Sequence, residues 1–89
     1  MKIERRAQIV NPEGLHARPS GTLVAIAQEF QSELRIACNG REVNGRSILE
    51  LITLGATCGS ELLFSAHGPD AEALVDALVQ AVSAGFGEH

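Results

Sequence analysis

The sequence comprises 89 residues with a formal net charge of −4, and 45% of its residues are hydrophobic. A chain of this length supports one hydrophobic core but not two, so we expect a single domain over residues 1–89. The acidic balance and an aromatic content of 3% disfavour nucleic-acid binding, which depends on basic residues and on aromatic stacking.

The sequence contains no apolar run of the ~18 residues that a membrane span requires, and its first residues do not resemble a signal peptide. Cys38 and Cys58 are far apart and have no clustered histidines nearby, which disfavours a zinc site or a redox motif. We therefore expect a monomeric cytoplasmic protein without metal or cofactor, in which both thiols are reduced and buried.

The first third of the chain predicts a strand, a loop and a helix. Residues 2–9 alternate between polar and apolar side chains, as in a half-buried strand, and residues 11–14 carry the proline and glycine of a loop. Apolar side chains then recur with helical spacing. Because proline is tolerated only in a first helical turn, Pro19 places the helix start close to His16, at the N-cap position. We expect this helix to end within residues 30–32.

The middle of the chain predicts a β-hairpin. Residues 33–38 alternate as in a strand, and residues 41–44 are the short returning strand. Between them, Asn39 and Gly40 form the dipeptide that a type I′ turn favours, because both positions of that turn need positive φ.

A short helix is expected after the hairpin. Ser47 and Glu50 have the spacing of a capping box, in which the serine hydroxyl accepts a backbone N–H and the glutamate reaches back to the N–H of the serine. The helix is apolar nearly all round, and Gly55 is its expected C-cap. Ser47 is either a purely structural cap or a phosphorylation site, and a phosphate there would face the Glu50 carboxylate.

The last third of the chain predicts a strand over residues 61–67 and a helix with Asp70 as its N-cap. An apolar stripe follows along residues 74–82, and Gly85 marks the end of the helix. The resulting order, β-α-β-β-α-β-α, predicts an α+β fold in which helices cover one face of a mostly antiparallel sheet.

His16 is the histidine whose surroundings favour chemistry, whereas His67 is interpreted as a solvated strand-end residue and His89 is terminal. The first N–H groups of a helix and its dipole favour an anion beside His16. Arg18 adds a fork of donors from the same turn, so a phosphoryl group on His16 would be stabilised there. The alternative is that His16 is only a cap and Arg18 only a solvated charge, and spacing alone does not decide between them.

Three blocks of sequence at matching spacing resemble the HPr family, the histidine-containing phosphocarriers of the bacterial phosphoenolpyruvate-dependent phosphotransferase system. Residues 14–19 are similar to its active-site signature, residues 39–48 to its regulatory-serine segment, and residues 59–74 to its last strand and last helix. The resemblance implies an open-faced β-sandwich with a four-stranded antiparallel sheet and three helices. It also implies a carrier rather than an enzyme that turns over substrate.

The resemblance further implies roles for individual residues. Enzyme I would phosphorylate His16 on Nδ1, with phosphoenolpyruvate as the source, and Arg18 would contact the phosphoryl group before an EIIA-type protein or domain accepts it. Ser47 occupies the position that an HPr kinase/phosphorylase modifies in some bacteria. The implied docking surface for enzyme I and EIIA includes Ala17, Ser20, Leu49, Leu51 and Ile52.

Two residues depart from the family pattern. Gly21 stands where many relatives have threonine and should loosen the first helical turns. Glu50 stands where many relatives have glycine and should hinder phosphorylation of Ser47 by charge repulsion. The alternative function is a regulatory module on the same fold, acting through Ser47 or protein contacts in nitrogen-type or catabolite-control signalling. The intact His16 and Arg18 favour the carrier, whereas the sugar and nitrogen branches are not separated by the sequence.

Overall fold

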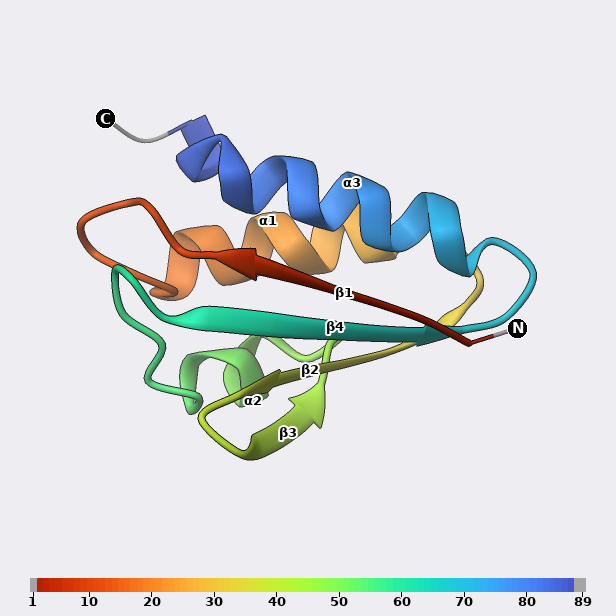
Figure 1. Ribbon diagram of the computed structural model, residues 1–89, viewed down its shortest axis with the longest axis horizontal. Coiled ribbons are helices and arrows are strands. Elements are labelled where there is room, and N and C mark those ends of the chain that lie inside the picture. The colour runs from red at the N-terminus through yellow and green to blue at the C-terminus, as the bar shows by residue number, and fades with distance from the viewer. Residues whose placement is uncertain (1, 88–89) are drawn as a thin grey trace.

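The computed structural model describes residues 2–87 and has the predicted element order (Figure 1). The elements are β1 (Lys2–Gln8), α1 (Ala17–Ala27), β2 (Glu33–Cys38), β3 (Arg41–Asn44), α2 (Ile48–Ile52), β4 (Glu61–His67), α3 (Ala71–Ser83) and a final 3₁₀ turn, η1 (Gly85–Gly87).

The four strands form one antiparallel sheet in the order β1-β4-β2-β3. Helices α1 and α3 cover one face of this sheet, and its other face is left open (Figure 1). The short helix α2 packs against α1 and β3. The predicted α+β architecture, an open-faced sandwich with three helices, is thereby confirmed.

The hydrophobic core lies between the sheet and the two long helices. Phe64 and Ile36 from the sheet meet Leu23, Leu74 and Leu78 from the helices, and all five side chains are fully buried. Burying each such side chain stabilises the fold by about 1.5–3 kcal/mol. The alternation in the strands and the helical stripes predicted this core, because each places its apolar side chains on one face.

The hairpin between β2 and β3 has the predicted turn. Asn39 and Gly40 have φ values of 54° and 82°, as a type I′ turn requires.

The predicted C-terminal ends of the first two helices lie too far along the chain. Helix α1 ends at Ala27, because the N–H groups of Glu29 and Phe30 bond to carbonyls three residues back and tighten the last turn. The C-cap of α2 is Thr53 rather than Gly55, which follows in a left-handed conformation with φ of 64°. The residue at which each helix ends depends on the path of the chain toward the next strand, which the local sequence does not determine.

One prediction for the cysteines was wrong. Cys38 is buried in β2, but Cys58 is exposed, because it lies in the surface turn before β4 with its Sγ 3.7 Å from the carbonyl oxygen of Val10. Within residues 2–87, no group of His, Cys, Asp and Glu side chains is arranged to hold a metal ion, and no helix has the length and apolarity to cross a membrane.

Candidate functional site

The loop between β1 and α1 approaches the backbone of Ala56 closely at Gly14. Gly14 has φ of 70°, and a Cβ there would lie 2.5 Å from the carbonyl oxygen of Ala56. The N–H of Leu15 donates to that same oxygen at 3.0 Å, and the side-chain amide of the buried Asn11 donates to the Gly14 carbonyl at 2.8 Å. Glycine is therefore required here for both conformation and space.

His16 occupies the predicted N-cap position of α1 with an extended backbone, and its carbonyl accepts the N–H of Ser20 at 3.1 Å. Its imidazole makes no capping hydrogen bond to the helix, and the side chain is 35% exposed. Pro19 lies in the first turn, where its missing N–H costs nothing. These observations weigh against the interpretation that His16 serves only as a cap.

A shallow depression at the start of α1 is lined by Glu13, His16, Ala17 and Arg18. The structure thus brings together the predicted pair, His16 and Arg18, on the first turn of a helix whose dipole favours an anion. It also adds a residue that sequence reasoning missed. The Glu13 carboxylate oxygen Oε2 lies 3.5 Å from Nε2 of His16. The sequence contained one signal for this contact, namely a glutamate three residues before the histidine with a glycine between them.

Three apolar side chains of α2 are exposed, and we call them the α2 patch: Ile48, Leu49 and Ile52 are 40%, 78% and 39% exposed. Two residues predicted for the docking surface are instead fully buried. Leu51 belongs to the hydrophobic core on which α2 packs, and Ser20 is fully buried on α1.

The patch adjoins α1 at Gly21, where a Cβ would lie 3.9 Å from Cδ1 of Ile48. Ala17 of the same helix is exposed, as a docking role requires. The exposed apolar surface therefore runs from α2 to the helix that begins at His16.

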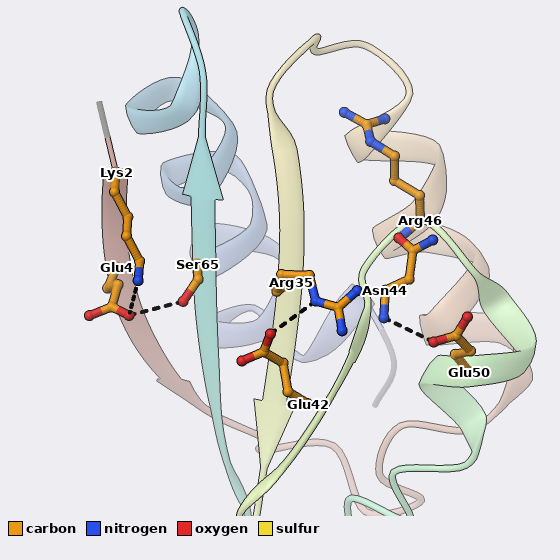
Figure 2. Close-up of polar contacts among 8 residues, drawn as sticks. All are labelled: Lys2, Glu4, Arg35, Glu42, Asn44, Arg46, Glu50 and Ser65. Carbon is orange, nitrogen blue, oxygen red and sulfur yellow. Dashed lines mark hydrogen bonds and ion pairs between the residues drawn. The ribbon is translucent and has the colours of Figure 1, made fainter.

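The capping box at α2 is only half formed. The Ser47 hydroxyl accepts the N–H of Glu50 at 3.2 Å, as predicted. The Glu50 carboxylate, however, accepts the N–H of Asn44 at 3.1 Å (Figure 2). The prediction that it binds the N–H of Ser47 was wrong, because that N–H donates to the Asn44 carbonyl at 3.2 Å.

The far end of α1 is held by Arg46. Its guanidinium donates to the carbonyl oxygens of Ala27, Phe30 and Ser32 at 2.6, 2.9 and 2.7 Å. Figure 2 shows Arg46 extending from the segment before α2 toward the chain that follows α1. Arg46 therefore binds the carbonyls of the last residue of α1 and of the turn that follows it, and it ties the segment next to Ser47 to α1.

Asp70 holds the same turn from the other side. Asp70 is the N-cap residue of α3, but its carboxylate does not cap that helix. It accepts the N–H groups of Gln31 and Ser32, each at 2.9 Å, and the Ser32 hydroxyl. The bond from the Ser32 side chain, followed by that from the Gln31 N–H, lowers the pKa of Asp70 below its usual value. The predicted N-cap position is confirmed, but the side-chain bond expected of an N-cap is absent, because the carboxylate binds the turn before β2 instead.

Comparison with known proteins decides the family. The family described as the PTS HPr component phosphorylation site matches residues 3–84. The chain belongs to the HPr family. Over 86 residues it is 37% identical to the phosphocarrier protein HPr of Cupriavidus necator, with 97% of each chain covered. The crystal structure of HPr-C-His from Thermoanaerobacter tengcongensis superposes with a TM-score of 0.92 at 36% identity and covers 98% of each chain.

HPr-type sequence also occurs within longer proteins. Over 84 residues the chain is 45% identical to the multiphosphoryl transfer protein of Vibrio cholerae, an alignment that covers 91% of this chain and 21% of that protein. The chain therefore spans about a fifth of the Vibrio protein and nearly all of the Cupriavidus HPr. The comparisons show membership of the HPr phosphocarrier family, and the roles of His16, Arg18 and Ser47 stay predictions.

Proposed function

We propose that the protein carries a phosphoryl group on His16, accepting it from enzyme I and passing it to an EIIA-type protein or domain. The observation that carries this proposal is the placement of His16 and Arg18 in one depression at the start of α1, in a chain of the HPr family. The chain would act as a single domain and as a relay, because the phosphoryl group only rests on it between two partners.

The transfer step needs one nucleophile and donors for an anion. The Nδ1 lone pair of His16 would form an N–P bond as the bond between phosphorus and the enzyme I histidine breaks. The phosphoryl oxygens would receive hydrogen bonds from Arg18 and from backbone N–H groups at the start of α1. Catalysis then consists of positioning and electrostatic stabilisation, which is what phosphoryl transfer requires from a protein.

The α2 patch supports the docking part of the proposal. Ile48, Leu49 and Ile52 expose apolar surface next to Gly21, one helical turn after Ala17, so a partner covering the patch and the start of α1 would also exclude water from His16. A patch of three side chains suits a transient complex, from which a carrier must be able to leave. We propose that Leu51 and Ser20, which are buried, support this surface from within the core.

The experiment is to incubate the protein with enzyme I and labelled phosphoenolpyruvate. We expect an acid-labile, base-stable label on the wild type and none on His16→Ala. Arg18→Ala should accept the label more slowly while unfolding at the wild-type denaturant concentration. Absence of label from the wild type, or label on His16→Ala, would overturn the proposal, and a large loss of stability in Arg18→Ala would make Arg18 structural.

The same assay with ATP and an HPr kinase tests the regulatory alternative. The Ser47 hydroxyl is engaged as an N-cap acceptor, and the Glu50 carboxylate lies in the same turn. We therefore propose that Ser47 is a poor kinase substrate whose modification improves in Glu50→Gly. Efficient modification of the wild type, unaltered by Glu50→Gly, would contradict this and favour a regulatory protein acting through Ser47.

A further inference from the structure

We propose that Glu13 is a positioning residue that holds a proton on Nε2 of His16, so that Nδ1 presents its lone pair to the phosphoryl donor. This inference rests on the proposed phosphocarrier function and assigns a part in it to a residue outside the sequence-predicted site.

The geometry that supports it is local and specific. Glu13 Oε2 lies 3.5 Å from His16 Nε2, and both side chains line the depression that also contains Arg18. The turn at Gly14 sets the separation of Glu13 and His16. This turn is fixed by the hydrogen bond that the Leu15 N–H donates to the Ala56 carbonyl at 3.0 Å. The contact therefore depends on a backbone conformation that the fold enforces, although the Glu13 side chain itself is 76% exposed.

The chemistry of the two partners selects one tautomer. A neutral imidazole carries hydrogen on one ring nitrogen and a lone pair on the other, and an ionised carboxylate only accepts hydrogen bonds. Glu13 therefore favours the His16 tautomer with hydrogen on Nε2 and the lone pair on Nδ1. Nδ1 and Nε2 lie on different sides of the imidazole ring, so a carboxylate at Nε2 does not itself occupy the position that a phosphoryl group on Nδ1 would take.

The same contact assists transfer in both directions. When Nδ1 forms the N–P bond and the donor N–P bond breaks, the His16 ring gains a formal positive charge, which the Glu13 carboxylate stabilises. When the phosphoryl group moves on, the bond electrons return to Nδ1 and the ring leaves as neutral imidazole with its Nε2 hydrogen in place. Without that hydrogen the leaving group would be an imidazolate anion, which is a far poorer leaving group than neutral imidazole.

The test compares Glu13→Gln with a matched control, Glu72→Gln. Glu72 is 67% exposed and lies 3.7 Å from Nη2 of Arg5, so it matches Glu13 in charge, exposure and the presence of a basic partner. It lies at the start of α3, at the opposite end of the molecule from the start of α1 (Figure 1). Any effect of net charge alone should therefore appear in both variants.

Two measurements are needed. The ¹⁵N chemical shifts of the His16 ring should report hydrogen on Nε2 in the wild type and in Glu72→Gln, and a mixture of tautomers in Glu13→Gln. The kcat for transfer from phosphorylated enzyme I should fall about two- to five-fold in Glu13→Gln, the size of an exposed ion-pair contribution, with KM unchanged.

The inference is overturned if the wild type accepts the phosphoryl group but Glu13→Gln keeps the wild-type shifts and kcat, or if Glu72→Gln loses as much activity. A fall in kcat without a change in ring shifts would also overturn it, because Glu13 would then act by another route. If the wild type accepts no phosphoryl group, the proposed function fails first, and the ring shifts alone report whether Glu13 sets the tautomer.

Discussion

The two ends of helix α1 are built in opposite ways. At its start, the His16 side chain makes no cap, and Ala17 and Arg18 are exposed. At its end, the turn into β2 is held by two charged side chains from distant elements, with Arg46 binding its carbonyls and Asp70 its N–H groups.

The difference teaches where such a site obtains its rigidity. Polar backbone groups at helix ends need partners, and at the end of α1 the protein supplies ionised ones. At the start of α1 the first turn remains accessible to an anion, and the close approach of Gly14 to Ala56 positions the loop that leads into it. The C-terminal end of α1, which we call the closed end, can therefore hold the helix in place. The N-terminal end, which we call the open end, stays exposed to partners.

The largest expected effect is the loss of Arg46. Arg46→Met should lower the free energy of unfolding by roughly 2–4 kcal/mol, because three carbonyls lose a charged donor. Urea denaturation measures the free energy of unfolding, and the folded variant should still accept a phosphoryl group on His16. The control is Arg35→Met, which removes an exposed ion pair with Glu42 on the open sheet face (Figure 2) and should cost about 0–1 kcal/mol. Equal losses in the two variants would contradict a special role for Arg46.

The next effect comes from the open end. Gly14→Ala should lower the free energy of unfolding by about 2 kcal/mol, from a positive φ and a clash with the Ala56 carbonyl, and should slow phosphorylation of His16. Gly40→Ala is the control, because Gly40 has a similar φ of 82° but no atom within 4 Å of its would-be Cβ. It should lose about 1 kcal/mol and keep the wild-type phosphorylation rate. Normal phosphorylation of Gly14→Ala would show that the loop does not position His16.

The smallest effect is a change in pH dependence at the closed end. Because its pKa is lowered in the folded protein, ionised Asp70 contributes stability that is fully present above the unfolded-state pKa of about 3.9 and is lost as pH falls through the native pKa. Asp70→Asn should therefore have a lower Tm than the wild type at neutral pH, with the difference shrinking below pH ~4. Asp76→Asn, at an exposed position in α3, is the control. A Tm difference that stays constant into acid would contradict an origin in the charge of Asp70.

Some features of the fold and site followed from sequence because they depend on neighbouring residues. The turn at Asn39 and Gly40 needs only their own φ preferences, and the placement of His16 needs only the proximity of Pro19. The contact between Glu13 and His16 also joins neighbouring residues. It depends, however, on the close packing of Gly14 against Ala56, which the loop sequence does not reveal.

Other features were mispredicted because competing partners lie far along the chain. Asp70 was expected to cap α3, yet its carboxylate binds Ser32, 38 residues away in sequence. Glu50 was expected to bind the N–H of Ser47, but the preceding turn had already satisfied that group and Asn44 offered another. A local motif names a possible hydrogen bond, and the tertiary structure decides whether a better partner is present.

The sequence by itself determined the order of elements, the hairpin, the core-facing alternation and the meeting of His16 and Arg18 on one helical turn, since each depends on preferences within a few residues. Only the tertiary structure decided how α1 is held at its far end and which apolar residues of α2 remain outside. Helix α2 is apolar nearly all round, so its pattern selects no face. Packing against α1 buries Leu51 and leaves Leu49 exposed, and long-range contacts alone make that choice.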